Sequence, residues 1–397
     1  MIFLDINTFF SPKAGGIRTY HQAKIAWFQA RREHRYIVLY PGPAHRAVPQ
    51  GGQVTLVEVY GPAVTRDPSG YRFLVDFLRI FDLIRSHKPD VLEAGDPWLT
   101  GLFCLALKKS GWYKGLLVSF YHSDPVPSYL EPWAERGHSR FGRYWKKHLV
   151  RMVGRLFYAI QKGYDLTAVS SKTMEAGLRS RGIQTLAYLP FGVPELFLDR
   201  AMSPGKIAAV PQDGGSPSRI RLLYAGRLDR EKGIELVLEA LPILLTDERV
   251  EISVIGRGGY AERFSAFKHP RFTYMGFLEN AAAVRDVYDR HDILLAPGPF
   301  ETFGLGVLEA MARGLRIVGP DRGGTGELLR QAESPYIFRA EDAGDFLRAV
   351  RAAIDGDPKS ESERSRALAL RYGTWDEAVG RMIDCYSGHI TRTGSSR

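Results

Sequence analysis

The chain has 397 residues, of which 45% are hydrophobic and 25% are charged, which indicates about two globular domains and excludes a largely disordered chain. Its two cysteines exclude a disulfide scaffold, and the lack of any run of roughly 18 apolar residues argues against a membrane span. The net charge of +10 lies in the first half, because residues 1–198 hold 26 basic and 15 acidic side chains. This asymmetry indicates an anionic partner: nucleic acid, an acidic membrane or a phosphorylated substrate.

The first half alternates short apolar runs with helical patterns, which is typical of a parallel sheet covered by helices. Its first residues, Met1–Asp5, predict a buried strand and no targeting segment, so we expect a cytoplasmic protein with reduced cysteines. Helical patterns follow at 70–86 and 99–109. The further predicted strands are residues 36–40, 54–57, 91–94, 116–120 and 166–169.

The second half repeats this rhythm, and residues 201–218 between the halves have the Pro, Gly and Ser content of a linker. We therefore expect an α/β protein with two Rossmann-like lobes that face a central ligand-binding cleft. The predicted strands of this half are 220–224, 250–255, 293–296 and 316–318, with helices that include 234–245 and 309–313. The expected boundaries are residues 1–197 for the first domain, 198–218 for the linker, 219–371 for the second domain and 391–397 for a disordered tail.

Two turns between a strand and a helix have the composition of anion sites. Gly15 and Gly16 precede a helical pattern, so their N–H groups could approach an anion, although a simple tight turn is the alternative. In the second half, Gly226 closes a strand, and Arg227 and Lys232 flank the turn that follows. A guanidinium and an ammonium there suit a diphosphate, and surface salt bridging is the alternative. Neither turn has the full dinucleotide or ATPase phosphate-loop motif.

The segment 296–312 is the most informative part of the chain. A strand ends at its start, and a helix begins near Gly304 or Leu305, where free N–H groups can hold a phosphate. Glu301 precedes this position and Glu309 lies within the helix. Carboxylates beside an anion repel it unless they accept hydrogen bonds from neutral donors such as sugar hydroxyls. The alternative is one solvent-facing glutamate and one that interacts with the helix dipole.

His122 follows the predicted strand 116–120 and so lies at the carboxyl edge of the sheet, where ligand-binding residues collect. An imidazole in this position could hydrogen-bond a substrate or transfer a proton. A loop histidine without a role is the alternative.

Glu301, the seven residues after it and Glu309 resemble the E-x7-E motif of the retaining glycosyltransferases of family 4, which have the GT-B fold. The resemblance extends from about residue 2 to residue 386, and Thr302 departs from it, because family members often have Gly or Ser there. It implies that residues 372–390 form a last helix that crosses back onto the first domain. Further landmarks in the expected order are Gly15–Gly16, His122, Phe191–Val193, Gly226–Gly233 and Gly319–Glu327.

The resemblance implies that the second domain binds a nucleotide-sugar donor. Arg227 and Lys232 would neutralise the donor diphosphate, and the Gly304 and Leu305 amides would hold it. Phe303 would also belong to the donor site, and Glu309 would accept hydrogen bonds from the ribose. The base would lie near Met275, Gly276 and Phe277.

The resemblance also implies which residues contact the transferred sugar. Glu301 would bind its hydroxyls, His122 would contact it near the anomeric carbon, and Gly15 and Gly16 would approach the phosphate from the other lobe. No cofactor is implied. The chain's D-x-D sequence, Asp355–Asp357, lies beside a proline and predicts a turn, so we expect turnover without a metal.

Residues 136–162 are the candidate segment for the acceptor-binding side of the protein. They carry eight cationic side chains and no carboxylate. Leu149, Val153, Leu156 and Ile160 have the spacing of one helical face. A basic amphipathic helix suits an anionic membrane surface, and the alternative is an apolar stripe packed on the first domain. Nucleic acid is disfavoured because no recognition fold accompanies the patch.

The stretch from Tyr121 to Tyr129 resembles the branch of the family that glycosylates lipids or lipid-linked intermediates, including GDP-mannose users. The resemblance therefore favours transfer of mannose from GDP-mannose, or of a UDP-hexose, to a hydroxyl acceptor such as a lipid or a lipid-linked glycan. An epimerase of the same architecture is one alternative. A non-catalytic nucleotide-sugar-binding protein is the other, and it would not need His122. A phosphorylase is disfavoured because no lysine has the setting of a Schiff base.

Overall fold

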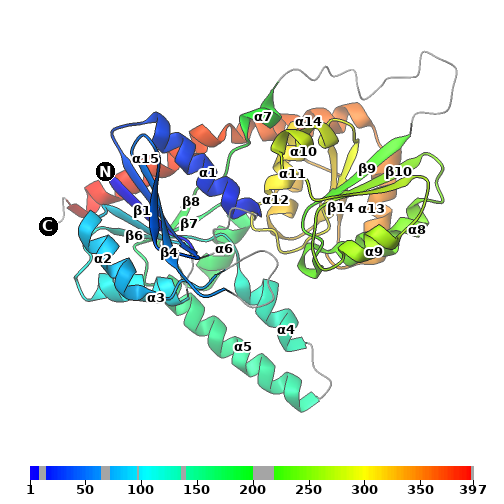
Figure 1. Cartoon of the computed structure of the whole chain (residues 1–397). Helices are drawn as coiled ribbons and strands as arrows, with labels where there is room; N and C mark the ends of the chain where they lie inside the picture. The colour runs from blue at the N-terminus through cyan, green and yellow to red at the C-terminus, as the bar shows by residue number, and fades with distance from the viewer. Residues whose placement is uncertain (9–14, 64–71, 96–97, 136–139, 200–218, 395–397) are drawn as a thin grey trace. The chain divides into compact units, whose positions relative to one another are not determined.

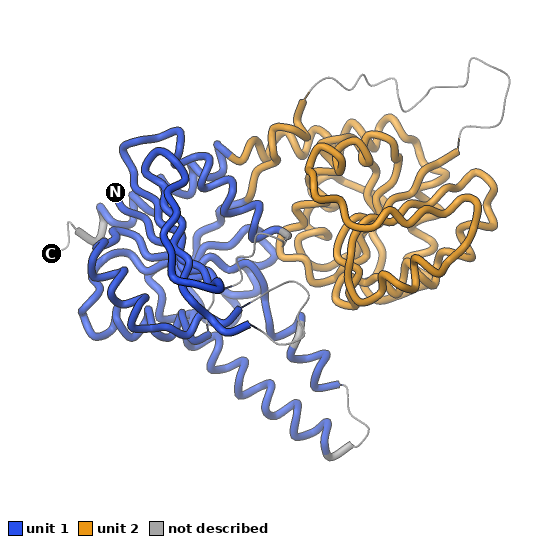
Figure 2. The backbone as a smooth tube through the Cα atoms, viewed as in Figure 1, with its two compact units in different colours: residues 1–190, 376–397 blue, residues 191–375 orange. Residues whose placement is uncertain are grey.

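The chain folds into two compact units, and a computed structural model describes residues 1–8, 15–63, 72–95, 98–135, 140–199 and 219–394 (Figure 1). The first unit comprises residues 1–190 together with 376–397, and the second comprises residues 191–375 (Figure 2). The chain thus returns to the first unit with its last helix. Nearly all of the predicted linker at 198–218 lies outside the described residues.

The first unit contains an eight-stranded sheet with the strand order β3-β4-β2-β1-β5-β6-β7-β8. All neighbouring strands are parallel except β3 and β4, an antiparallel edge pair that the sequence analysis missed. The strands are β1 Ile2–Ile6, β2 Arg35–Gly42, β3 Arg46–Gly51, β4 Val54–Tyr60, β5 Val91–Ala94, β6 Leu116–Phe120, β7 Leu166–Val169 and β8 Leu186–Tyr188.

Helices cover both faces of this sheet, because alternate residues of a strand point to opposite sides. In β1, Leu4 and Ile6 enter a core shared with α2 and α3, whereas Phe3 and Asp5 contact α1. No described helix is both long and apolar enough to cross a membrane. The helices are α1 Gly15–Ala30, α2 Phe77–His87, α3 Leu99–Lys109, η1 Val126–Leu130, α4 Glu131–Glu135, α5 Arg140–Gln161, α6 Lys172–Ser180 and α15 Trp375–Gly394.

Two expectations for the first unit need correction. The helix predicted at 70–86 begins only at Phe77, because the Asp76 side chain accepts a hydrogen bond from the backbone N–H of Arg79 at 3.0 Å and caps the helix there. The tail expected to be disordered from residue 391 continues α15 as far as Gly394. No glycine or proline stands between residues 389 and 393 to end this helix earlier.

Helix α5 has two apolar faces and projects with α4 from the first unit (Figure 1). Val150, Phe157 and Ile160 are buried on its inner face. The predicted stripe at 149, 153, 156 and 160 is therefore divided, because Leu149 and Leu156 lie on the other face. The exposed large apolar side chains of α5 are Tyr144, Trp145, Leu149, Met152 and Leu156.

The second unit contains a six-stranded sheet with the order β11-β10-β9-β12-β13-β14, in which every pair is parallel. The strands are β9 Ile220–Ala225, β10 Val250–Ile255, β11 Phe272–Gly276, β12 Ile293–Leu295, β13 Arg316–Pro320 and β14 Ile337–Phe338. The helices are α7 Glu195–Leu198, η3 Arg230–Lys232, α8 Ile234–Leu244, α9 Ala261–Ala266, α10 Ala281–Tyr288, α11 Leu305–Ala312, α12 Gly323–Gln331, α13 Ala343–Asp355 and α14 Pro358–Tyr372.

The boundaries of the units differ from the predicted domain boundaries. Residues 191–197, expected in the first domain, lie in the second unit, and so do residues 372–375. The Phe191 ring lies 5.0 Å from that of Trp375 and 5.2 Å from that of Phe303. Packing between aromatic rings far apart in the sequence sets this boundary, and strand and helix periodicity carries no information about it.

Candidate active site

The turn after β9 carries both cations predicted to bind a diphosphate. The Arg227 guanidinium donates to Asp229 Oδ2 at 2.8 Å and lies 2.7 Å from Glu231 Oε1. Lys232, the last residue of η3, donates from Nζ to Glu301 Oε1 at 2.5 Å. Both cations are thus balanced by carboxylates, and Lys232 is balanced by the same glutamate that is predicted to bind the sugar.

Two glycines bring the turn of Lys232 against the loop that carries Glu301. Gly233 has a φ of 66°, and a Cβ there would lie 2.6 Å from the Pro297 carbonyl oxygen. A Cβ on Gly298 would lie 3.3 Å from the Lys232 Cα. The two backbones therefore approach to a distance that leaves little room for side chains, which places Lys232 beside Glu301.

The start of α12 supports the Glu301 loop from another side. The backbone N–H of Gly324 donates to the Glu301 carbonyl oxygen at 2.6 Å. Gly323 has a φ of 64°, and a Cβ on it would lie 2.6 Å from the same oxygen. The sequence analysis included this segment as a family landmark but did not name Gly323 or Gly324 as site residues. The signal for them was a Gly-Gly pair separated by two residues from the end of a buried strand.

Helix α11 begins beside this loop with an open N-terminus. Gly304 is the N-cap in the left-handed conformation, with a φ of 91°, and no described side chain caps the helix. The N–H groups that start at Leu305 therefore lack intrahelical acceptors and form a seat for an anion. The ring of Phe303 is buried against Phe191 and Tyr372, so only its main chain is open to a donor.

Glu309 is the fifth residue of α11, and burial raises its pKa to about 8. Its carboxyl group accepts no hydrogen bond from any described residue. A desolvated carboxyl group of this kind is satisfied by hydroxyl donors or by a proton. The arrangement therefore matches the predicted role as an acceptor for ribose hydroxyls.

The predicted base-binding residues lie at the end of β11. Gly276 has a φ of 71°, and its carbonyl oxygen accepts a hydrogen bond from the Gly256 N–H at 2.7 Å. The side chains of Met275 and Phe277 are exposed on either side of it. Arg257, which is not among the predicted site residues, places its guanidinium 4.2 Å from the centre of the Phe277 ring.

His122 lies directly after β6 in the first unit, at the carboxyl edge of the sheet as predicted. Its ring stacks on Phe120 at a centroid distance of 4.8 Å and meets the Tyr20 ring edge-on at 4.7 Å. Burial lowers the pKa of His122 to about 4. The imidazole is therefore neutral at physiological pH and acts as a hydrogen-bonding group and not as a cation.

Gly15 and Gly16 are the first two residues of α1, so their amides belong to the first turn of a 16-residue helix. Gly16 is exposed, and the preceding residues 9–14 lie outside the described part of the chain.

A buried ionic cluster lies beneath His122 and was not predicted. Lys24 of α1 donates to Asp5 at 2.5 Å and to Glu93 at 3.1 Å. Glu93 also accepts hydrogen bonds from the hydroxyls of Tyr20 at 2.7 Å and of Tyr386 in α15 at 2.9 Å. The signal that could have revealed the cluster is the presence of Asp5 and Glu93 within otherwise apolar strands.

Family models match both halves of the chain. Residues 15–194 match the model described as Glycosyltransferase Family 4, and residues 219–355 match the model described as Glycosyl transferases group 1. The chain belongs to the family 4, group 1 glycosyltransferases. The resemblance that was drawn from Glu301 and Glu309 is confirmed.

Curated relatives of this glycosyltransferase differ in the share of their length that matches. The chain is 24% identical to the GDP-mannose-dependent alpha-(1-6)-phosphatidylinositol dimannoside mannosyltransferase of Mycobacterium tuberculosis, over 96% of this chain and 95% of the relative. It is 26% identical over 70% of its length to sulfoquinovosyl transferase SQD2 of Arabidopsis thaliana, and 28% identical over 72% to a glycogen synthase of M. tuberculosis. It spans only 52% and 65% of those two relatives.

Solved structures confirm the predicted GT-B fold. Sucrose-phosphate synthase from Thermosynechococcus elongatus matches with a TM-score of 0.72 at 18% identity, over 98% of this chain and 99% of that one. Anabaena HepE in complex with UDP and glucose matches with a TM-score of 0.66 at 14% identity, over 97% and 99%.

Proposed function

We propose that this glycosyltransferase moves a sugar from a nucleotide diphosphate donor to a hydroxyl acceptor and retains the anomeric configuration. The observation that carries the proposal is the Lys232–Glu301 pair beside the open N-terminus of α11. It joins a cation suited to a diphosphate with a carboxylate suited to sugar hydroxyls, next to amides suited to phosphate oxygens.

The proposed catalysis depends on the positions at which charge develops in the transition state. When the anomeric C–O bond breaks, negative charge grows on the diphosphate and the sugar becomes oxocarbenium-like. Lys232, Arg227 and the amides that start at Leu305 stabilise the departing diphosphate, and loss of one such group typically costs ~3–4 kcal/mol. The donor phosphate takes the place of Glu301 on Lys232, and Glu301 then accepts hydrogen bonds from the sugar.

The neutral state of His122 defines its part in the reaction. An uncharged imidazole with a pKa of about 4 is a poor general acid near neutral pH, because it holds no second proton to give. His122 instead orients the transferred sugar by a hydrogen bond.

Turnover is proposed to need no metal. Both carboxylates of the D-x-D sequence have structural partners: Asp355 accepts from Arg249 at 3.0 Å, and Asp357 caps α14 through the Lys359 N–H at 3.1 Å. The cations of the donor site supply the positive charge that a metal would otherwise supply. Full activity in EDTA is expected, and loss of activity that Mg²⁺ or Mn²⁺ restores would contradict this part of the proposal.

The proposed donor is GDP-mannose and the proposed acceptor is a lipid or a lipid-linked glycan. This choice is supported by the relative that matches over nearly the whole of both chains, which is named as a GDP-mannose-dependent phosphatidylinositol dimannoside mannosyltransferase. A UDP-hexose is the alternative donor, since HepE was solved with UDP and glucose. A thermal-shift screen of nucleotide sugars distinguishes them, because a ligand stabilises the native state that binds it.

The outer face of α5 is proposed to bind an anionic membrane surface. Trp145, Met152 and Leu156 are 60%, 63% and 56% exposed, and together with Leu149 they follow helical spacing along one stripe. Lys147, Arg151 and Arg155 form an exposed stripe beside them. Apolar side chains flanked by cations match the interface of a bilayer with acidic headgroups. Sedimentation with anionic and neutral vesicles tests this, and equal binding to both would contradict it.

The decisive experiment separates transfer from binding. His122→Ala and Glu301→Ala are compared with the wild type for donor binding and for sugar transfer, with NMR detection of the anomeric product. An enzyme loses transfer while donor binding persists in His122→Ala. A protein that only binds nucleotide sugars shows no transfer in the wild type, and an epimerase returns a free altered nucleotide sugar.

A further inference from the structure

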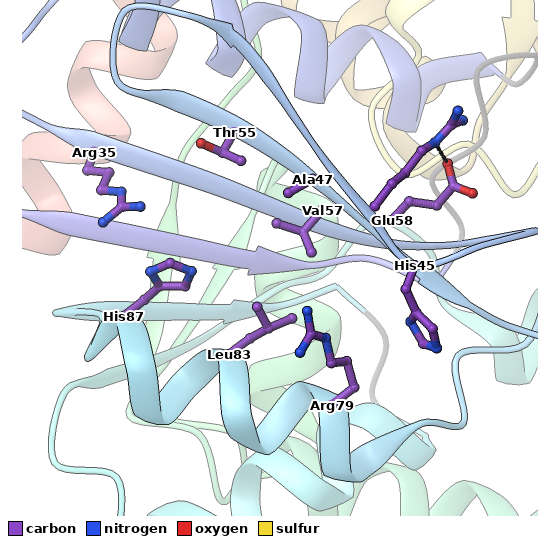
Figure 3. A pocket seen from close by; sticks show the side chains of 10 residues that line it. Arg35, His45, Ala47, Thr55, Val57, Glu58, Arg79, Leu83 and His87 are labelled. Carbon is purple, nitrogen blue, oxygen red and sulfur yellow. Dashed lines mark hydrogen bonds and ion pairs between the residues drawn. The ribbon is translucent and has the colours of Figure 1, made fainter.

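A cavity lies within the first unit, and none of its lining residues belongs to the proposed donor site. It has a volume of about 450 Å³ and lies between α2 and the sheet formed by β2, β3 and β4 (Figure 3). Val57 of β4 and Leu83 of α2 form its apolar walls. Arg46 and Glu58 also line it but form an ion pair with each other, which leaves two guanidinium groups and two imidazoles to give the cavity its chemical character.

These four groups are arranged as two pairs. Arg35, the first residue of β2, and His87, the last residue of α2, lie at one end of the cavity, and Arg79 and His45 lie toward the other (Figure 3). The first pair is half-buried, whereas Arg79 and His45 are exposed at the rim. Burial and the nearby Arg35 guanidinium lower the pKa of His87, so the two groups act on each other electrostatically.

The carboxylates near the cavity have other partners. Glu58 accepts from Arg46 Nε at 2.6 Å, which cancels both charges. Asp76 caps α2 and lies 3.7 Å from His45 at the rim. Arg35 and Arg79 form no ion pair with any described residue, although Arg31 and Arg179 elsewhere in the first unit do so. The half-buried end of the cavity therefore carries a positive charge that no described carboxylate pairs with.

We propose that this cavity binds a phosphate-bearing small molecule, with its phosphoryl group at Arg35 and His87 and its body along Val57 and Leu83. A guanidinium forms two parallel hydrogen bonds to phosphate oxygens, and an imidazole adds one more. The attraction is strongest at the half-buried end, where water screens it least. Arg79 and His45 close over the ligand at the rim.

The test follows the imidazole resonances of the full-length protein by NMR during titration with inorganic phosphate, with ionic strength held by NaCl. His87 is assigned from its absence in His87→Gln. Bound phosphate favours the imidazolium form, so the pKa of His87 is expected to rise by about one unit. The same rise is expected in Arg85→Gln, which removes a cation of α2 that does not line the cavity. It is expected to disappear in Arg35→Gln and to weaken in the rim variant Arg79→Gln.

No change at His87 in the folded wild type at tens of millimolar phosphate would overturn the proposal, and so would an equal change in Arg35→Gln. A second arm identifies the source of the phosphate. A soluble hexose phosphate and a short-chain phosphatidic acid are titrated in the same way, and one of them is expected to bind at least tenfold more tightly than inorganic phosphate. Equal affinities for inorganic phosphate, the hexose phosphate and phosphatidic acid would show that Val57 and Leu83 do not contact the non-phosphate part of a ligand.

Discussion

Lys232 Nζ lies 2.5 Å from Glu301 Oε1, so the cation and the carboxylate that the proposed reaction uses separately are bonded to each other in the free protein. The pair keeps both charges balanced while the site holds no donor. In the proposed reaction, the donor phosphate replaces Glu301 on Lys232 and the sugar hydroxyls replace Lys232 on Glu301, so little unbalanced charge is created. Several outcomes can be expected from this and related contacts.

Lys232→Met retains the length of the side chain and removes its charge. Catalytic efficiency, kcat/KM, should fall by about 100- to 1,000-fold, because the variant lacks one donor to the leaving diphosphate and leaves Glu301 to repel it. The double variant Lys232→Met/Glu301→Gln should regain part of the donor affinity measured by calorimetry, though not the turnover. Arg230→Met, which removes a neighbouring exposed cation, is the control. Weaker donor binding by the double variant than by Lys232→Met would contradict the repulsion argument.

Donor affinity should depend on the ionisation of Glu309. Its pKa is raised to about 8 in the free protein, and ribose hydroxyls donate hydrogen bonds to the ionised form. Binding at pH 7 should therefore release close to one proton, which calorimetry in buffers of different ionisation enthalpy measures directly. Affinity should decrease as the pH falls below 8. Glu309→Gln should bind donor with no proton release and with no such pH dependence.

The same group should influence stability with a defined sign. An unfolded glutamate titrates near 4.5, whereas folded Glu309 titrates near 8. Between these values the folded chain holds a proton that the unfolded chain has lost, so stability falls as the pH rises from 4.5 to 8. Glu309→Gln should have a higher Tm than the wild type at pH 8 and a similar Tm at pH 4.5. A lower Tm of Glu309→Gln than of the wild type at pH 8 would show that the ionised Glu309 side chain does not destabilise the folded protein.

His122→Ala should reduce kcat by about 10- to 100-fold with little change in donor affinity, since one hydrogen bond to the reacting sugar is lost. His148→Ala on α5 is a matched control outside the site. The His122 ring should remain neutral in NMR spectra down to about pH 5, because burial lowers its pKa to about 4. The unfolded chain takes up this proton near 6.5, so His122 should lower stability as the pH falls from 6.5 to 4. A protonated ring at pH 6 would contradict both statements.

Through the buried cluster around Lys24, α15 should contribute to the stability of the first unit. Lys24→Met leaves Asp5 and Glu93 as two buried carboxylates without their shared cation, which should cost about 3–5 kcal/mol in chemical unfolding. Tyr386→Phe removes one donor to Glu93 and should cost about 1–3 kcal/mol. Tyr372→Phe in the second unit, whose hydroxyl donates to Gln331, is a matched control expected to cost less, because that bond is only partly buried.

Membrane binding should depend on the outer face of α5. Met152→Gln combined with Leu156→Gln should weaken sedimentation with vesicles of phosphatidylglycerol, because apolar surface no longer enters the headgroup region. Leu78→Gln on α2, which changes an exposed leucine away from α5, is the control. Replacement of Lys147, Arg151 and Arg155 by glutamine should reduce binding by about 1 kcal/mol per cation. Unchanged binding in both sets would end the proposal of a membrane surface on this helix.

Much of the fold was determined by local patterns in the sequence. The strands at 91–94, 116–120 and 166–169 and the helix at 99–109 agree with the structure to the residue. Their apolar spacing is strong, and each is bounded by turn residues. The donor-site loops were also accessible, because the spacing between Glu301 and Glu309 and the glycines near Lys232 lie within short segments.

The tertiary structure decided what depends on contacts between distant residues. The bond between Lys232 and Glu301 joins residues 69 positions apart, and the neutral state of His122 results from burial under aromatic rings. The division of α5 into a buried and an exposed apolar face depends on what packs against it. Spacing along the chain reports local geometry alone, whereas desolvation and long-range packing exist only once the elements have assembled.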